Sequence, residues 1–172
     1  MKWYDFVKAT DNTAIYPEAG SGSVVELAYI ALGLAGEIGK AIEASSEPHE
    51  VRAELADALW YVARGMRALQ VHGYQLADVY PGSTKNMQEA PLLVANTTKK
   101  LMRDGLERAT LDHLAVLYSL SLDALYEMLA ELETNGTEQI HLDRFEGLLD
   151  DLVFKLESRK ARGVPHGSGD AR

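Results

Sequence analysis

Apolar residues recur at helical spacing through most of this 172-residue chain, and this periodicity restricts it to an all-α fold. Residues 24–44 give the clearest case, because apolar side chains return there every three or four positions, as one buried helix face requires. These side chains are Leu27, Ile30, Leu34, Ile38 and Ile42. The strict alternation of apolar and polar residues that is typical of strands is absent. Comparable patterns predict a short first segment through residue 10, and helical stretches over 49–72, 75–80, 87–104, 110–134 and 139–161.

Loop-forming residues separate the first two of these segments. Residues 11–23 contain Pro17, Gly20 and Gly22 and are expected to form a loop. Ser23 can cap the helix that follows, because its side-chain oxygen can accept a hydrogen bond from a free N–H of the first turn.

Three glycines, Gly33, Gly36 and Gly39, interrupt the helix predicted over 24–44. A glycine inside a helix costs about 1 kcal/mol relative to alanine, so a group of three requires a reason. Close approach of another helix or of a ligand would supply one, and the spacing alone does not choose between them.

Length and charge favour one compact, cytoplasmic domain. A chain of 172 residues can bury a proper core. Its net charge of −9 argues against a nonspecific nucleic-acid surface, which requires a basic patch. The chain has no cysteine, which excludes disulfide frameworks and thiolate metal sites and fits a reducing compartment. The N-terminal residues lack a signal-peptide core, and no apolar run approaches the ~20 residues that a membrane span requires, so no membrane association is expected.

Acidic residues accompany the apolar stripes of the first two long helices. Glu54 and Asp57 are three positions apart and therefore project from one face, and Glu37 can meet them if the two helices pack antiparallel. Three converging carboxylates favour a hard divalent cation such as Mg²⁺, because isolated buried carboxylates would be costly. The alternative is ordinary charge on solvated helix faces.

Five short runs, three in the first half of the chain and two at its end, form a recognisable set. They are Thr13-Ala-Ile-Tyr-Pro-Glu18, Ala31-Leu-Gly-Leu-Ala-Gly-Glu37, Glu54-Leu-Ala-Asp-Ala-Leu-Trp-Tyr61, Lys155-Leu-Glu-Ser-Arg-Lys-Ala-Arg-Gly163 and His166-Gly-Ser-Gly-Asp-Ala-Arg172. Together they resemble the MazG-like branch of the all-α nucleoside triphosphate pyrophosphohydrolases, of the phage and actinobacterial type. The resemblance implies a MazG-like helical bundle, with additional helices inserted before the C-terminal helix. One domain would span residues 1–172, with 81–138 as a helical insertion or a degenerate repeat and 163–172 as a glycine-containing tail.

The resemblance also implies a catalytic metal centre. Family members hold Mg²⁺ with a Glu-x-x-Glu pair on one helix and a Glu-x-x-Asp pair on the next. Glu37, Glu54 and Asp57 match three of these positions and become the expected catalytic and metal-binding residues, with Mn²⁺ as a second possible ion. Lys40 replaces the fourth carboxylate. Glu50 on the second helix is a possible substitute, although it and Glu26, which shares a face with Glu37, are more readily interpreted as surface charges.

Further residues are expected at the substrate. Lys40 offers a charge to a phosphate, and Tyr61 is a candidate wall of the site, whereas its neighbour Trp60 is expected in the core. Arg64 is interpreted as a surface ion pair more readily than as a phosphate ligand. The resemblance adds the phosphate-binding side chains Lys155 and Arg159, and the tail residues Asp170 and Arg172 as polar contacts.

Two functions follow from these residues. The first is Mg²⁺-dependent hydrolysis of (deoxy)nucleoside triphosphates to a nucleoside monophosphate and pyrophosphate, for control or clean-up of the nucleotide pool. The second is a catalytically weakened nucleotide-binding or helical scaffold protein, because Lys40 removes one expected ligand. A homodimer is the default assembly for such a bundle, unless the additional helices replace the partner.

Overall fold

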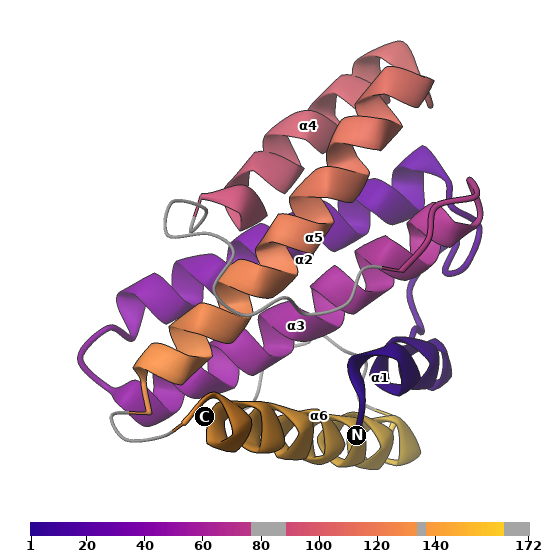
Figure 1. The fold of residues 1–172 in the computed structure, drawn as a ribbon. Helices are drawn as coiled ribbons and strands as arrows, with labels where there is room; N and C mark the ends of the chain where they lie inside the picture. The colour runs from indigo at the N-terminus through magenta and orange to yellow at the C-terminus, as the bar shows by residue number, and fades with distance from the viewer. Residues whose placement is uncertain (77–88, 134–136, 164–172) are drawn as a thin grey trace.

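The computed structural model describes residues 1–76, 89–133 and 137–163, and in these residues it contains helices and no strand (Figure 1). The all-α class predicted from the sequence is therefore confirmed. The elements are α1 (Trp3–Ala9), the 3₁₀ turn η1 (Thr10–Asn12), α2 (Val24–Glu43), α3 (Pro48–Gln70), α4 (Ala90–Asp104), α5 (Arg108–Glu131) and α6 (Glu138–Ala161).

Most helix ends follow from local chemistry. The Ser23 side chain accepts a hydrogen bond of 3.2 Å from the backbone N–H of Glu26 and caps α2 as expected. Pro48 begins α3, where the missing proline N–H costs no helical hydrogen bond. Gly105 ends α4 with φ +86°, a backbone angle that glycine adopts without strain.

Three predicted boundaries were wrong or lie partly outside the described residues. The helix predicted over 110–134 is observed at Arg108–Glu131, and residue 134 is not described. The described part of the stretch predicted over 75–80, residues 75 and 76, is not helical. Residues 77–80 and the first two residues of the helix predicted over 87–104 are not described.

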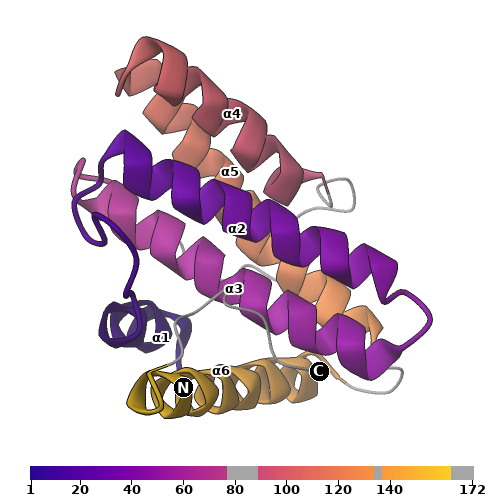
Figure 2. The same ribbon diagram turned by 180° about the vertical axis from the view of Figure 1, so that it is seen from behind.

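Four helices form a closed bundle. The short connection at residues 44–47 makes α2 and α3 an antiparallel pair, and the connection at 105–107 does the same for α4 and α5. The pairs pack together, since α4 lies against α2 and α5 lies against α3 (Figures 1 and 2). Helices α1 and α6 cover the remaining side of α3. Trp60 is fully buried in this core, as predicted.

The helices interlock where glycine faces tyrosine. A Cβ atom built on Gly33 would lie 2.1 Å from the ring of Tyr61, and one built on Gly65 would lie 2.1 Å from the ring of Tyr118. Gly33 therefore lets α2 approach α3, and Gly65 lets α3 approach α5. A Cβ atom at Gly36 or Gly39 would meet nothing within 4 Å, so helix packing explains only the first of the three glycines in α2.

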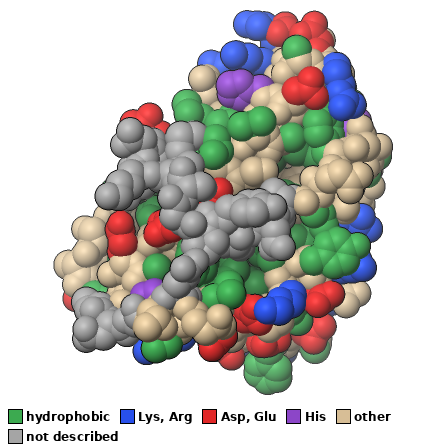
Figure 3. Space-filling model, viewed as in Figure 1, with side chains coloured by type: hydrophobic (Ala, Val, Ile, Leu, Met, Phe, Trp, Pro, Cys, Tyr) green, Lys and Arg blue, Asp and Glu red, His purple; other side chains and the backbone are tan. Residues whose placement is uncertain are grey.

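Surface charge is mixed at the end of the bundle where α4 ends and α5 begins. On the face shown in Figure 3, basic and acidic side chains lie together at that end, and acidic side chains are numerous near α6. Lys99, Lys100 and Arg103 lie exposed at the C-terminal end of α4, where the helix dipole favours cations, and Arg103 pairs with Asp104 at 2.6 Å. Among the described residues, no helix combines the length and the apolar character needed to cross a bilayer.

Candidate metal centre

The three carboxylates predicted from the sequence converge where α2 packs against α3. Glu37 projects from α2, and Glu54 and Asp57 project from consecutive turns of α3. One carboxylate oxygen from each of the three lies within 4.8 Å of the others. Glu37 is buried, and the other two are half-buried. The antiparallel pairing of the helices therefore brings together residues that are 17 and 20 positions apart in the chain.

Electrostatics make this cluster costly without a cation. The pKa of Glu37 is raised from its ordinary 4.5 to about 6, chiefly by burial. The hydrogen bond with Lys40 acts to lower this pKa, whereas the hydrogen bond with Glu54 and the charge of Asp57 act to raise it. A group that holds its proton more tightly in this environment than in water is destabilised as an anion. Compensating positive charge is therefore favoured at this position.

Two lysine ammonium groups, from α2 and α6, contact the cluster. Lys40 Nζ lies 2.6 Å from Glu37 Oε2 and 3.6 Å from Glu54 Oε2. Lys155 Nζ reaches across from α6 and lies 3.0 and 2.9 Å from the two oxygens of Asp57. Burial acts to lower the pKa of Lys40, but its hydrogen bond with Glu37 and the neighbouring negative charges outweigh burial and raise it. Lys40 thus remains charged and pairs with two of the three carboxylates.

Of the remaining predicted substrate residues, Tyr61 and Arg159 are described, and both are buried. Tyr61 lies one turn beyond Asp57, where it is 3% exposed and packs against Gly33. The pKa of Tyr61 is raised, chiefly by burial and also by neighbouring groups that include Tyr29 and Glu37. Arg159 is buried on α6, one turn beyond Lys155. Asp170 and Arg172 lie outside the described residues.

Two residues interpreted as surface charges prove to be buried. Glu26 is fully buried at the start of α2, and Arg64 is 1% exposed on α3. The Glu26 carboxylate accepts hydrogen bonds from the Tyr16 hydroxyl at 2.9 Å and from the backbone N–H groups of Gly20 and Gly22 at 2.7 Å. Glu26 is therefore an interior anchor for the loop before α2, and its prediction as a surface charge was wrong.

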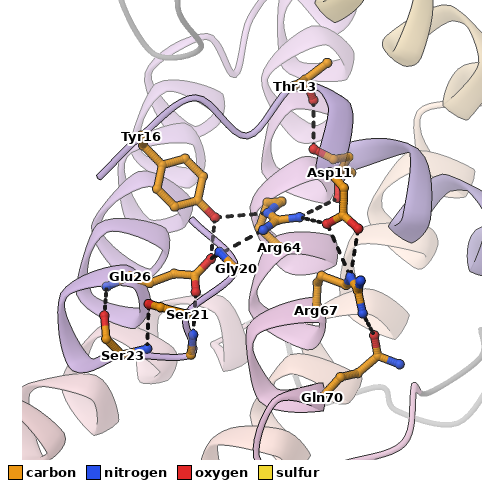
Figure 4. Close-up of polar contacts among 12 residues, drawn as sticks. Asp11, Thr13, Tyr16, Gly20, Ser21, Ser23, Glu26, Arg64, Arg67 and Gln70 are labelled. Carbon is orange, nitrogen blue, oxygen red and sulfur yellow. Dashed lines mark hydrogen bonds and ion pairs between the residues drawn. The ribbon is translucent and has the colours of Figure 1, made fainter. Parts of the chain in front are cut away.

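Arg64 connects this loop to α3 (Figure 4). Its guanidinium lies 3.3 Å from Glu26, donates to the Tyr16 hydroxyl at 3.0 Å and forms an ion pair with Asp11. Arg67, one turn further along α3, donates to both carboxylate oxygens of Asp11, at 3.2 and 3.0 Å. The ion pair predicted for Arg64 exists, but in the interior, because residues 11–23 fold over α3 and supply its partners. Sequence spacing gave no signal for contacts between residues about 40 to 50 positions apart.

The cluster fits a divalent cation in chemistry. Its donors are carboxylate oxygens, which Mg²⁺ prefers, and Mg²⁺–oxygen distances of about 2.0–2.1 Å require opposite ligands to lie about 4 Å apart. Three oxygens on one octahedral ion also include at least two adjacent pairs about 2.9 Å apart, so carboxylates whose oxygens lie within 4.8 Å of one another would have to close by up to about 2 Å around the ion. Glu50, one turn before Glu54, is not part of the group. Three carboxylates are therefore the ligands available among the described residues, and Lys40 would have to leave two of them.

The fold and this cluster define an all-helical protein with a candidate metal centre between two antiparallel helices. No family model matches the chain, and no solved structure matches it. The chain is 34% identical over 77 residues to the Gene 37 protein of Mycobacterium phage L5, a match that covers 37% of this chain and 68% of that protein. It belongs to the family of that phage protein. The name of the relative specifies no reaction or ligand, so the function is argued from the site.

Proposed function

We propose that this protein is a divalent-cation-dependent hydrolase that converts (deoxy)nucleoside triphosphates to nucleoside monophosphates and pyrophosphate. The observation that supports this proposal is the convergence of Glu37, Glu54 and Asp57 within 4.8 Å at the α2–α3 contact. The MazG-like character of the sequence around these residues supplies the reaction and the substrate class. Control or clean-up of the nucleotide pool is the corresponding role.

In this proposal the three carboxylates hold Mg²⁺, or Mn²⁺ in its place. The bound ion supplies neutralisation of the triphosphate charge and a lowered pKa for a bound water. Lys40 and Lys155, whose ammonium groups contact the carboxylates, exchange these contacts for phosphate oxygens when substrate binds. Water attacks the α-phosphorus, the bond to the oxygen bridging to the β-phosphate breaks, and pyrophosphate leaves with that oxygen.

Product analysis with matched variants tests this proposal. The protein is incubated with each common nucleoside and deoxynucleoside triphosphate, with Mg²⁺ or with chelator, and pyrophosphate is separated from orthophosphate. We expect Mg²⁺-dependent pyrophosphate release that falls by at least about 10–100-fold in Glu54→Gln and Asp57→Asn, since even the outer partners of metal ligands contribute that much. Glu50→Gln, one turn earlier on α3, should retain activity. Equal activity in all three variants would refute the assignment of the site.

Lys40 favours a second candidate, a nucleotide-binding or scaffold protein with weakened catalysis. Its ammonium already neutralises Glu37 and Glu54, so the cluster can persist without a metal ion. Lys40→Glu adds the fourth carboxylate that the MazG-like pattern contains and should raise both Mg²⁺ affinity and turnover. Lys40→Met removes the competing charge without adding a ligand. Mg²⁺ binding without turnover in wild-type protein, and turnover in Lys40→Glu, would favour the weakened relative. Absence of Mg²⁺ binding in all three proteins would refute the hydrolase, and absence of nucleotide binding as well would refute a nucleotide-binding role.

A further inference from the structure

A cavity of about 300 Å³ lies between α3 and α6, next to the carboxylate cluster. Its apolar lining comes from Ala53 and Ala56 on α3 and from Leu148 and Leu152 on α6. The two alanines explain the hollow, because larger side chains at these positions would fill the space between the helices. The volume is at the lower end of the range of about 300–1,000 Å³ that is typical of small-molecule pockets. The cavity therefore fits a compact group and is too small for a folded peptide segment.

Lys155 joins this cavity to the carboxylate cluster. It lines the cavity, and its ammonium lies 2.9 Å from Asp57, one of the three candidate metal ligands. Ala56 in the cavity lining is the chain neighbour of Asp57. A molecule whose phosphates lie at the carboxylates can therefore extend into the cavity along Lys155.

The rim of the cavity is polar and offers both hydrogen-bond donors and an acceptor. Arg52 and Lys155 supply donors, Asp151 supplies an acceptor, and His49 adds an imidazole that can do either. Arg52 is held near the rim by Glu133, whose carboxylate lies 3.6 Å from its guanidinium. A cavity lined by apolar side chains and by both hydrogen-bond donors and acceptors fits a planar heteroaromatic ring. Such a ring packs its face on apolar side chains and forms hydrogen bonds along its edge. An aliphatic chain would leave the rim groups unused.

We infer that this cavity binds the nucleobase of the nucleotide whose phosphates lie at Glu37, Glu54 and Asp57. The inference rests on the proposed function and adds that the base is a required part of the substrate. Inorganic polyphosphates bind at the carboxylates alone. Nucleotides bind more tightly because they add the contacts of the base with the apolar lining and the rim.

Two matched alanine-to-leucine variants test the inference. Ala53→Leu enlarges a side chain that lines the cavity, and because Ala53 is exposed, α3 accommodates the change. Ala109→Leu makes the same change at an exposed position in the first turn of α5, which does not line this cavity. Isothermal titration with Mg²⁺ measures the binding of two probes, an α,β-imido deoxynucleoside triphosphate for each base and inorganic tripolyphosphate.

We expect Ala53→Leu to raise the Kd of the preferred nucleotide analogue by at least about tenfold, because one methylene more or less in an apolar pocket already changes affinity by that factor. Tripolyphosphate binding should be unchanged. Ala109→Leu should change neither. The Leu148 and Leu152 methyl resonances should shift with the nucleotide analogue and not with tripolyphosphate, because only an aromatic ring adds a ring current. Equal nucleotide affinity in wild type and Ala53→Leu, or methyl shifts that are the same for both probes, would overturn the base site alone. Wild-type protein that binds neither probe with Mg²⁺ would instead refute the proposed function.

Discussion

The contact between Gly33 and Tyr61 predicts opposite effects for the same substitution at two glycines of α2. Replacing an interior helical glycine by alanine contributes about 0.5–1 kcal/mol when the new methyl group meets no neighbour. Gly36 meets that condition, because a Cβ atom there has open space within 4 Å. Gly36→Ala should therefore raise the free energy of unfolding by about 0.5–1 kcal/mol.

Gly33→Ala should lower the free energy of unfolding. Its Cβ atom would lie 2.1 Å from Tyr61 Cε1 and 2.3 Å from Cζ, so the ring must move by more than an ångström to reach ordinary contact. Tyr61 has little room, since it is buried and Trp60 packs edge-on with ring centroids 5.0 Å apart. Overpacking of this kind costs about 1–3 kcal/mol. After the gain in helix propensity of about 0.5–1 kcal/mol, we expect Gly33→Ala to be less stable than wild type by up to about 2.5 kcal/mol.

Urea unfolding followed by far-UV circular dichroism and by tryptophan fluorescence measures both variants against wild type. The dependence on urea should keep the same slope, so that a shift in midpoint reports stability. In a Tyr61→Ala background the obstacle is absent, and Gly33→Ala should then stabilise the protein as Gly36→Ala does. The reasoning fails if Gly33→Ala stabilises the protein with Tyr61 in place, or if its destabilisation persists when Tyr61 is removed.

Two further predictions concern buried charge. Arg64→Met should lower the free energy of unfolding by about 3–5 kcal/mol, because Glu26 would remain buried without its cation. The control Arg67→Met removes a half-exposed partner of Asp11 and should lower the free energy of unfolding by less than about 1 kcal/mol in the same urea titration. The pKa of Glu37 is raised in the folded protein to about 6 from 4.5, so the folded state binds more protons between these values. Stability in chelator should therefore fall as pH rises from 4.5 through 6, by up to about 2 kcal/mol at 1.4 kcal/mol per pKa unit, and this fall should be absent in Glu37→Gln. A wild-type protein whose stability relative to Glu37→Gln is independent of pH would show that Glu37 is not destabilised by burial.

The sequence predicted the long helices and the convergence of the carboxylates well, because both depend on local periodicity. The helix predicted over 24–44 is observed at Val24–Glu43, and the one predicted over 49–72 at Pro48–Gln70. Helical spacing places Glu54 and Asp57 on one face of α3, and a short connection forces α2 to return beside it. These relations operate over one helix or one hairpin.

Burial of charge was not predictable in this way. Glu26 and Arg64 occupy helix positions that look polar and exposed, yet both become interior when residues 11–23 fold across α3. Their partners, Tyr16 and Asp11, lie in a segment without periodicity, so spacing cannot indicate the contacts. The cavity between α3 and α6 has the same origin, since its two walls are about 100 residues apart in the chain and its depth depends on how α6 crosses α3.

The packing of α2 on α3 links the stability of the fold to the candidate metal centre. Gly33 lies one turn before Glu37 on α2, and Tyr61 lies one turn after Asp57 on α3, so their contact sets the separation of the helices next to the carboxylates. A wider separation of the helices at Gly33 would move Glu37 away from Glu54 and Asp57. The carboxylate oxygens, which now lie within 4.8 Å of one another, would then be further apart. Gly33→Ala should therefore weaken Mg²⁺ binding in isothermal titration at temperatures where the variant is still folded, whereas Gly36→Ala should not. Equal Mg²⁺ affinity in the two variants would mean that the carboxylates are positioned independently of this contact.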